Sequence, residues 1–350
     1  MSMESLPPQI MQYQQIHNLV QAEFTIEEAF IEHDVPTFFV TLQPNSKQAF
    51  LRLYKQLNAM GLAPFFRKRD DKYELRILPK PLVKPSRTTT NIALFLATIG
   101  TLFATGYLLS LNWTQYHPII GAAMFAAAVM AIIGAHEMAH KLASNRHGVE
   151  ASYPYFIPGL PPLGTFGAVI QQKSLAPNRD ALFDLGMSGP VTGFIVTIFV
   201  TIMGLQLSQL TFTLPENASP LQVPLLFDLI SAIFPPIGQG TILLLHPVAY
   251  AGYIGMLVTM LNLLPAGQLD GGHVARVLLG EKARTILGYI AILALIVIGA
   301  WLMAILVFFF IRYPHPGSLD DVSPLSMSRK LVAIALIAIF VLTVAPLITL

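Results

Sequence analysis

The chain has 350 residues, of which 54% are apolar and 11% are charged. Soluble domains carry about 25% charged residues, so this composition excludes an ordinary soluble protein and indicates a chain largely embedded in lipid. The chain has no cysteine, which excludes disulfides and thiolate zinc sites. Its net charge of +2 gives no indication of a nucleic-acid partner.

The charged residues are concentrated near the N-terminus. Residues 1–87 hold 9 acidic and 11 basic residues, half of all the charged residues in the chain. We therefore expect a small N-terminal cytoplasmic α+β domain over residues 1–85 and a membrane-embedded domain over residues 86–350. The first 30 residues show no signal-peptide or transit-peptide pattern, so the first apolar span is expected to act as the insertion signal.

The N-terminal domain is predicted to contain three strands and a helix. The strands are expected at residues 35–42, 64–69 and 72–78. Asn45 or Ser46 could cap a helix that presents one apolar face, runs to about Met60 and stops at Gly61. Residues 80–87 carry proline and lysine and are expected to form a linker into the membrane.

The remainder predicts a polytopic α-helical membrane protein, because a spanning helix needs about 20 mostly apolar residues. Six transmembrane helices are expected, at roughly residues 90–111, 117–143, 187–207, 244–264, 285–311 and 330–350. Basic residues gather before the first span, between the second and third, and between the fourth and fifth, whereas the 208–243 segment has none. The positive-inside rule then favours a cytoplasmic N-terminus. The 312–330 segment carries both signs of charge and fits this pattern less well.

The second predicted span ends in the sequence AIIGAHEMAH. His136 and His140 are four residues apart and share a helix face, with Glu137 beside them. In this H-E-x-x-H pattern the imidazoles bind Zn²⁺ and the carboxylate acts as general base toward the metal-bound water. Ionisable groups on a membrane span cost several kcal/mol unless they are paired or functional, which argues against a chance match.

A catalytic zinc site has three protein ligands and leaves a fourth position for water. Asp270 is the favoured third ligand, because it lies in NLLPAGQLDGGH at the cytoplasmic end of the fourth predicted span. This end is on the same side of the membrane as His140. Pro265 and Gly267 are expected to break the helix there, and residues 271–272 to keep the backbone loose. The other candidates lie in loops or on the far side of the membrane: His147, Glu150, Asp180, Asp184, Glu216, Asp228 and Glu281.

The four remaining histidines of the membrane-embedded domain are assigned other roles. His273 follows Asp270 closely and is interpreted either as a partner of a ligand or as a surface residue. His117 and His246 lie at the outer membrane edge and are expected to be structural. His315 is expected to be a turn residue.

These residues resemble the site-2 protease family of intramembrane zinc metalloproteases. HEMAH at 136–140 and LDGG at 269–272 match the motifs on the family's second and fourth spans, and the spacing of Asn262, Pro265 and Asp270 fits as well. The resemblance covers roughly residues 90–345. It implies His136, His140 and Asp270 as ligands of a Zn²⁺ cofactor and Glu137 as the catalytic acid/base.

The segment between the second and third spans also looks like this family, through GTFGA at 164–168, Asn178-Arg179-Asp180 and Gly189-Pro190. The resemblance implies a re-entrant β-hairpin-like segment over residues 153–172, part of which could pair with an unwound substrate by strand addition. The implied substrate-binding residues are Gly164, Phe166, Gly167 and Asn262. Gly189-x-x-x-Gly193 is interpreted as a helix-packing notch.

The N-terminal α+β unit and the HPGSLDD stretch at 315–321 resemble the branch of the family found in cyanobacteria, plant plastids and some archaea. A plasma membrane or a thylakoid-type membrane is the expected location. The partners expected are the lipid bilayer, a single-span transmembrane protein as substrate and an upstream protease that trims this substrate first.

The predicted function is cleavage of transmembrane segments by an intramembrane zinc metalloendopeptidase, in regulated intramembrane proteolysis. A membrane zinc transporter or a non-catalytic membrane scaffold could use the same His/Asp site. Transporters often show repeated halves, and no second segment like H-E-x-x-H or LDG is present. A scaffold has no need for Glu137. A prenyl-protein protease would require a Glu ligand on another helix, and none is placed for that role.

Overall fold

The computed structural model describes residues 8–81, 87–111, 113, 115–213, 220–297, 299–312 and 315–344. The chain divides into two compact units. The first combines residues 1–84 with two short segments, 174–182 and 316–326. The second contains the rest of the chain. The predicted division at residue 85 did not anticipate the two short segments.

The first unit is a four-stranded antiparallel sheet with the strand order β1-β2-β4-β3. The strands and the two helices are α1 (Pro8–Glu23), β1 (Ile26–Glu32), β2 (Val35–Val40), α2 (Ser46–Ala59), β3 (Leu62–Arg69) and β4 (Lys72–Pro79). Alternate strand residues such as Phe38 and Leu75 point to one face, where they pack with Val20 of α1 and Phe50 of α2 in a single buried cluster. The predicted strands and the helix are confirmed.

The two short segments join this sheet through the residue pair Leu319-Asp320. The backbone N–H of Phe66 donates to the Leu319 carbonyl at 2.9 Å. Asp320 forms isolated β-bridges with Phe66 and with Asn178. Lys47 of α2 pairs with Asp180 at 3.1 Å. Three parts of the sequence that lie far apart therefore build one unit.

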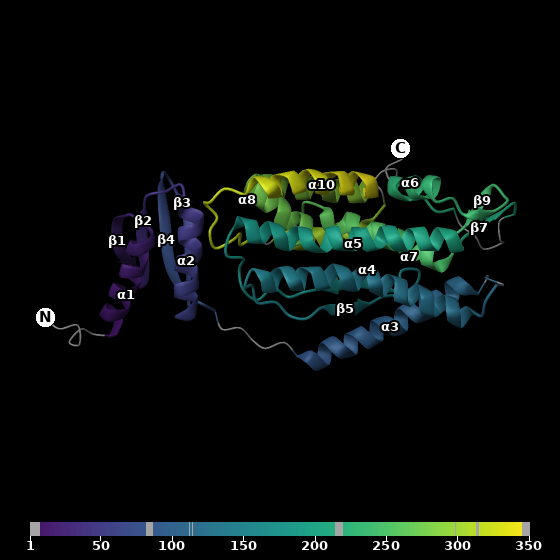
Figure 1. Cartoon of the computed structure of the whole chain (residues 1–350), viewed down its shortest axis with the longest axis horizontal. Coiled ribbons are helices and arrows are strands. Elements are labelled where there is room, and N and C mark those ends of the chain that lie inside the picture. Colours follow the sequence, from purple (N-terminus) through teal and green to yellow (C-terminus); the bar gives the residue numbers. More distant parts are fainter. Residues whose placement is uncertain are drawn as a thin grey trace. The chain divides into compact units, whose positions relative to one another are not determined.

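The second unit is helical. Its helices are α3 (Thr88–Ser110), α4 (Pro118–Arg146), α5 (Arg179–Leu207), α6 (Leu225–Ile233), α7 (Pro247–Leu263), α8 (Asp270–Val297), α9 (Trp301–Ile311) and α10 (Met327–Val344). Figure 1 shows α4, α5 and α10 running along a common direction. Buried residues such as Phe125 and Ile132 of α4 pack with Ala249 and Met256 of α7, which makes α7 a central helix.

Short strands complete the second unit. The hairpin of β5 (Tyr155–Pro158) and β6 (Thr165–Val169) follows α4, and β5 packs against α3. A small sheet with the order β8-β7-β9 is built from β7 (Gln209–Thr211), β8 (Ile237–Gly238) and β9 (Ile242–Leu244). This sheet lies in the connection between α5 and α7.

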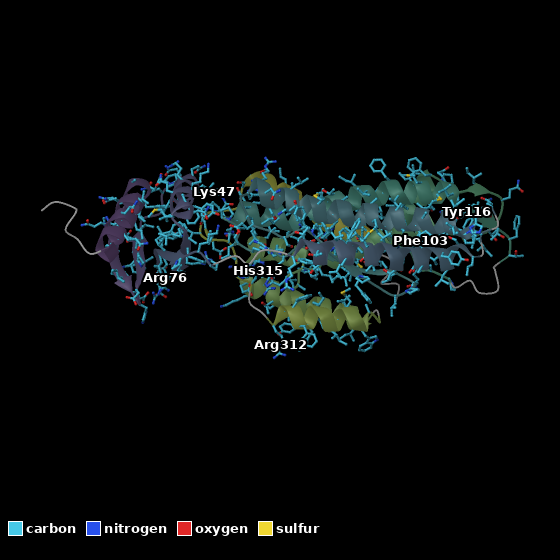
Figure 2. All side chains as sticks on the ribbon, turned by 90° about the horizontal axis from the view of Figure 1, so that it is seen from below. Lys47, Arg76, Phe103, Tyr116, Arg312 and His315 are labelled. Atoms are coloured by element: carbon cyan, nitrogen blue, oxygen red, sulfur yellow. The ribbon has the colours of Figure 1, made fainter. Side chains whose placement is uncertain are left out.

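Four described helices are long and apolar enough to cross a membrane: α3, α4, α5 and α10. Their outer faces carry exposed apolar side chains, including Leu96, Phe199 and Ile337, and Figure 2 shows Phe103 on this unit. The expected helix at 244–264 is present as α7, which has 17 residues. The last expected helix is described as far as Val344, and its final six residues lie outside the described ones.

The structure differs from the sequence prediction over residues 285–311. One continuous helix is expected there, but α8 ends at Val297 and α9 begins at Trp301. Gly299 between them has φ +79°, a left-handed conformation that ends a helix. An unbroken apolar run conceals this turn, because hydropathy does not distinguish one long helix from two that fold back on each other.

Candidate metal centre

The first part of the site comes from one helix. A helix of 3.6 residues per turn places His136 and His140 one above the other on the same face of α4. The side chains of His136 and Glu137 are buried, at 3% and 5% exposure. The Glu137 carboxylate lies 3.9 Å from Nε2 of His136. The H-E-x-x-H residues therefore face the interior of the unit.

The second part comes from the break between α7 and α8. The helix α7 ends at Leu263, and Gly267 has φ +55° in the irregular segment that follows. Asp270 is the first residue of α8, so its carboxylate sits at a helix N-terminus, where the helix dipole favours negative charge. The expected break at Pro265 and Gly267 is confirmed.

The expected loose backbone at the next two residues is wrong. Gly271 and Gly272 lie in the first turn of α8 and are helical. A Cβ on Gly271 would lie 2.1 Å from the Leu263 carbonyl oxygen, and one on Gly272 would lie 2.5 Å from the Gly267 carbonyl oxygen. Glycine is needed here because the helix starts against the backbone that precedes it, and the close approach fixes Asp270 in place.

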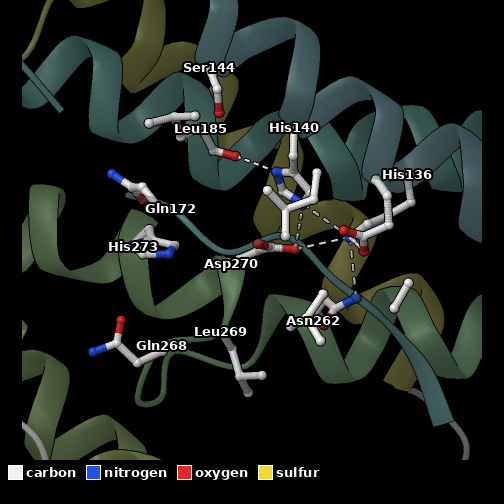
Figure 3. Close-up of a pocket in the computed structure, with 14 residues that line it drawn as sticks. His136, His140, Ser144, Gln172, Leu185, Asn262, Gln268, Leu269, Asp270 and His273 are labelled. Carbon is white, nitrogen blue, oxygen red and sulfur yellow. Dashed lines mark hydrogen bonds and ion pairs between the residues drawn. The ribbon is translucent and has the colours of Figure 1, made fainter. Parts of the chain in front are cut away.

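The structure brings the three predicted ligands together (Figure 3). Nε2 of His136 and Nε2 of His140 are 3.1 Å apart, and each is 3.2 Å from Oδ2 of Asp270. Metal bonds of about 2.0–2.1 Å at tetrahedral angles place ligand atoms roughly 3.3 Å apart. The triangle of two imidazole nitrogens and one carboxylate oxygen therefore fits a tetrahedral metal ion with one position left open.

Neighbouring groups orient the histidine rings. Nδ1 of His140 lies 2.8 Å from the Leu185 carbonyl oxygen of α5. An N–H on Nδ1 that donates to this carbonyl leaves Nε2 unprotonated and ready to bind a metal. The amide nitrogen of Asn262 is 3.4 Å from Nε2 of His136. The predicted substrate-binding residue Asn262 thus lies beside the ligands.

The glycines of α5 make room for these rings. A Cβ on Gly189 would lie 2.1 Å from Nε2 of His140 and 2.7 Å from Nε2 of His136. A Cβ on Gly193 would lie 3.1 Å from Nδ1 of His136. The predicted packing notch is therefore also the space into which the side chains of His136 and His140 fit.

A cavity of about 140 Å³ opens at the three ligands. Ala168 and Val169 from the end of β6 line it together with Gln172 and the ligand residues. Phe166 and Gly167 precede them on the same strand, and the Phe166 side chain is 59% exposed. Gly164 lies elsewhere, because a Cβ there would meet Thr105 of α3.

The sequence did not predict that a group of polar residues gathers near Asp270. The group consists of His273, Glu281, Arg284 and His315. His273 lines the cavity, and its Nδ1 lies 2.6 Å from Nε2 of His315. His315, which was expected to be a turn residue, is buried at 6% exposure, and burial lowers the pKa of its ring to about 2. Arg284 and Glu281 form an ion pair next to it. The two histidines are 42 positions apart in the sequence, and this separation concealed their contact.

Two of the other acidic candidates, Asp180 and Asp184, form ion pairs, and Glu216 lies outside the described residues. Asp184 lies 2.9 Å from His147 and 2.6 Å from Arg329. Asp180 pairs with Lys47 in the first unit. His246 caps α7 by accepting a hydrogen bond from the backbone N–H of Val248. The structural roles expected for these residues are consistent with these contacts.

Comparison with known families finds one match, the model described as "Peptidase family M50", over residues 124–306. This region covers more than half of the 350 residues. It contains His136, Glu137, His140 and Asp270.

Several curated plant proteins are similar to the chain. "Probable zinc metalloprotease EGY1, chloroplastic" of Arabidopsis thaliana is 34% identical over 249 residues, or 66% of this chain and 44% of the relative. EGY2 of Oryza sativa subsp. indica, with the same description, is 31% identical over 57% of this chain and 37% of its own. "Probable zinc metallopeptidase EGY3, chloroplastic" of Arabidopsis thaliana is 28% identical over 76% of this chain and 50% of its own. The chain thus spans half or less of these relatives, and no solved structure matches it.

Proposed function

Because the chain belongs to peptidase family M50, we propose that it is an intramembrane zinc metalloendopeptidase that cleaves transmembrane segments of membrane proteins. The observation that carries this proposal is the meeting of His136, His140 and Asp270 beside Glu137. The two histidines and Glu137 lie on α4, a helix long and apolar enough to cross a bilayer. These three side chains would hold the zinc ion. Bound zinc makes a water molecule acidic enough to supply hydroxide near neutral pH.

The protein residues divide the remaining work. The Glu137 carboxylate takes the proton of the attacking water and passes it to the amine of the leaving peptide. Its distance of 3.9 Å from Nε2 of His136 suits a water held between carboxylate and ligands. The Asn262 amide donates a hydrogen bond to the scissile carbonyl oxygen, whose negative charge grows as the water attacks. The Leu185 carbonyl keeps His140 in the correct tautomer.

The substrate enters as an extended segment along β6. Within the described residues, β5 and β6 form a two-stranded sheet. The end of β6 lines the metal cavity. An unwound substrate that pairs with this strand would present its backbone carbonyls to the cavity. Phe166 and Gly167 lie on the pairing strand, and we propose the hairpin as a re-entrant element that meets the substrate within the membrane.

The expected substrate is a single-span membrane protein, trimmed first by an upstream protease so that its segment can unwind. The protein is an integral membrane protein whose N-terminal unit faces the cytoplasm, in a plasma membrane or a thylakoid-type membrane. The positive-inside rule supports this orientation through the basic residues Arg87, Lys141, Arg146 and Lys173, which lie between or before the apolar helices. The transporter and scaffold alternatives are not favoured for a member of a peptidase family.

The test is a paired measurement on detergent-purified protein. Wild type, Glu137→Gln and Asp270→Ala are compared for bound zinc and for cleavage of a reconstituted single-span substrate. We expect about one zinc per wild-type chain, retention of zinc in Glu137→Gln with cleavage reduced about 10²- to 10⁴-fold, and loss of zinc in Asp270→Ala. Full cleavage by Glu137→Gln would overturn the mechanism. Zinc uptake into vesicles without cleavage would favour a transporter instead.

A further inference from the structure

Arg284 is an unusual residue for the interior of a membrane unit, because its side chain is fully buried, at 0% exposure. Its Nη1 donates a hydrogen bond to the Gly267 carbonyl at 2.9 Å. Its Nε and Nη2 donate to the two carboxylate oxygens of Glu281 at 3.0 and 2.6 Å. A buried charge in such a setting is costly unless it is paired, and it marks a functional position more often than a structural one.

The carbonyl that Arg284 holds belongs to the segment that delivers Asp270. Gly267 is three residues before Asp270 and lies in the break between α7 and α8. A break in a helix leaves backbone carbonyls without their usual partners. Arg284 reaches this carbonyl because Gly280, with φ 86° and ψ 176°, interrupts α8 and turns its second part.

The same ion pair also reaches the residues that follow Asp270. Oε1 of Glu281 accepts a hydrogen bond from the backbone N–H of His315 at 3.2 Å. The ring of His315 in turn meets Nδ1 of His273 at 2.6 Å. His273 lies three residues after Asp270 and lines the cavity. The backbone before Asp270 and the side chain after it are thus fastened to one Arg–Glu pair.

We propose that Arg284, together with Glu281, is a positioning residue that fixes the Asp270 carboxylate at the metal centre. This inference rests on the proposed metal site and not on the identity of the substrate. Loss of the pair frees the Gly267 carbonyl and lets the start of α8 shift, so the carboxylate leaves the position 3.2 Å from both imidazole nitrogens. Removing partners that orient metal ligands typically lowers metal affinity about 10- to 100-fold.

The test uses the detergent-purified chain of 350 residues. Zinc affinity is measured by competition with a chelator, and the visible absorption of the Co²⁺-loaded protein reports the coordination geometry. Arg284→Ala is expected to weaken zinc binding about 10- to 100-fold and to change the Co²⁺ spectrum, whereas Arg284→Lys recovers part of the affinity. The matched control is Lys282→Ala, because Lys282 is exposed two residues away on the same helix.

Thermal unfolding of the apo-protein separates positioning from folding. If Arg284→Ala does not fold, Glu281→Gln decides, since it keeps the size of the side chain and removes only the charge. Zinc affinity and Co²⁺ spectrum both equal to wild type in a folded variant would overturn the proposal. Because these measurements read the metal site directly, they hold even if the chain cleaves none of the substrates offered.

A second inference concerns the membrane topology and is carried by a different observation, the hairpin of α8 and α9. A Cβ on Gly288 of α8 would lie 2.1 Å from Cδ1 of Ile311 at the end of α9. Residues Ala291, Leu295, Ala304 and Val307 of the two helices belong to one buried cluster. The helix α9 therefore runs back along the second part of α8.

The turn between these helices suits the interior of a bilayer. Around Gly299 the chain reads Val297 to Trp301 without a charged residue. The N–H groups of Gly299 and Ala300 donate to the carbonyls of Ile296 and Leu295, at 3.1 and 2.8 Å. Hydrocarbon demands that backbone groups be satisfied in this way. Eleven residues of α9 extend about 16 Å, which is short of the roughly 30 Å hydrocarbon core.

After α9, the chain lies at the end of the helical unit where the metal centre is, and α10 begins there. Arg329 in the first turn of α10 pairs with Asp184 near the start of α5, and Asp184 also contacts His147, which follows α4. Figure 2 places His315 and Tyr116 at opposite ends of this unit. From there α10 runs to the other end, where Leu342 packs against the cluster that contains Phe227 of α6.

We infer that the α8–α9 hairpin enters the membrane and returns to the same side. Within the described residues, four helices are long and apolar enough to cross the bilayer, namely α3, α4, α5 and α10. With the 17-residue α7 as a further crossing, the chain crosses five times, in place of the six crossings expected from hydropathy. The C-terminal end of α10 lies on the side opposite to the metal-site end of α4. Arg312, Arg329 and Lys330 join the other basic residues on the metal-site side, as the positive-inside rule favours.

The lack of cysteine makes this inference directly testable by labelling of single introduced cysteines with a membrane-impermeant maleimide in sealed vesicles of known orientation. The exposed positions Asn145 and Thr213 serve as references for the two sides. Ser328→Cys is expected to be labelled from the same side of the vesicle membrane as Asn145→Cys. A cysteine appended after Leu350 is expected to be labelled from the same side as Thr213→Cys. Trp301→Cys, 61% exposed at the turn, is expected to label only after detergent is added.

Two outcomes would overturn this topology. Labelling of Ser328→Cys together with Thr213→Cys would restore a single crossing over residues 285–311. Labelling of Trp301→Cys from the Thr213 side in intact vesicles would show that α8 and α9 each cross fully.

Discussion

At the scale of residues, the site depends on glycine as much as on the ligands. Two imidazoles and a carboxylate can approach within 3.2 Å of one another only if the opposing helix has no side chain there. Gly189 provides that space, and Gly271 and Gly272 provide it for the start of α8. These glycines therefore determine how closely the two imidazoles and the carboxylate can approach one another.

Gly189→Ala is predicted to abolish metal binding. The added methyl group would lie 2.1 Å from Nε2 of His140. This nitrogen is the atom that would bind the metal, so the ring would have to move away from the site. The measurement is zinc content after purification, with Gly134→Ala as control, because a Cβ on Gly134 has no neighbour within 4 Å. We expect less than a tenth of the wild-type zinc in Gly189→Ala and full zinc in Gly134→Ala. Wild-type zinc in both variants would refute the steric argument.

At the scale of elements, the β5–β6 hairpin reaches the metal cavity and is the element proposed to bind the substrate. Strand β6 ends in residues that line the cavity, while Phe166 on the same strand remains exposed. An exposed strand beside a metal centre can add a substrate strand, so apolar contacts along β6 contribute binding free energy equally in the ground state and the transition state.

Phe166→Ala is therefore predicted to raise KM about tenfold and to leave kcat nearly unchanged, since an aromatic side chain contributes about 1.5–3 kcal/mol on burial. Steady-state cleavage of the reconstituted single-span substrate measures both constants. Leu160→Ala in the turn of the same hairpin is the control, because Leu160 is 76% exposed and lies outside β6. A fall in kcat at unchanged KM would contradict strand addition at this position.

At the scale of the whole molecule, the first unit is assembled from three parts of the sequence around Asp320. The side chain is fully buried, and its Oδ1 accepts hydrogen bonds from the backbone N–H groups of Val322 and Ser323 at 3.0 and 2.9 Å. Its Oδ2 has no hydrogen-bond partner among the described residues. Burial, the largest cause, raises the pKa of Asp320 above its ordinary 3.8, despite these hydrogen bonds and the nearby Lys47.

The raised pKa gives the stability of this unit a definite pH dependence. The folded state holds the Asp320 proton more tightly than the unfolded state, so its contribution to stability falls as pH rises from about 4 through the folded-state pKa. Asp320→Asn removes this titration, and its thermal stability relative to wild type is predicted to improve as pH rises from about 4 to 7.

Thermal unfolding of the full chain, followed through this pH range, tests the prediction. Asp321→Asn removes the same charge one residue away and is the matched control. An identical pH dependence of the two variants relative to wild type would show that Asp320 is not responsible.

The sequence by itself determined that His136, Glu137 and His140 lie together on one helix and that the helix breaks near Asp270, because helical spacing and helix-breaking residues act over a few positions. It also determined three strands and one helix of the first unit, from alternating and helical apolar patterns. It could not show that α8 and α9 fold back, since apolar side chains face either lipid or protein without a change in pattern.

Only the tertiary structure decided which distant residues meet. The pair His273–His315, the reach of Arg284 to Gly267 and the joining of 174–182 and 316–326 to the N-terminal sheet all cross long sequence separations. Such contacts depend on how whole helices pack, and a helix at membrane depth presents a similar apolar surface in many directions. Local patterns therefore indicated the residues of the candidate site, while helix packing determined the geometry of that site and the folding of α9 back onto α8.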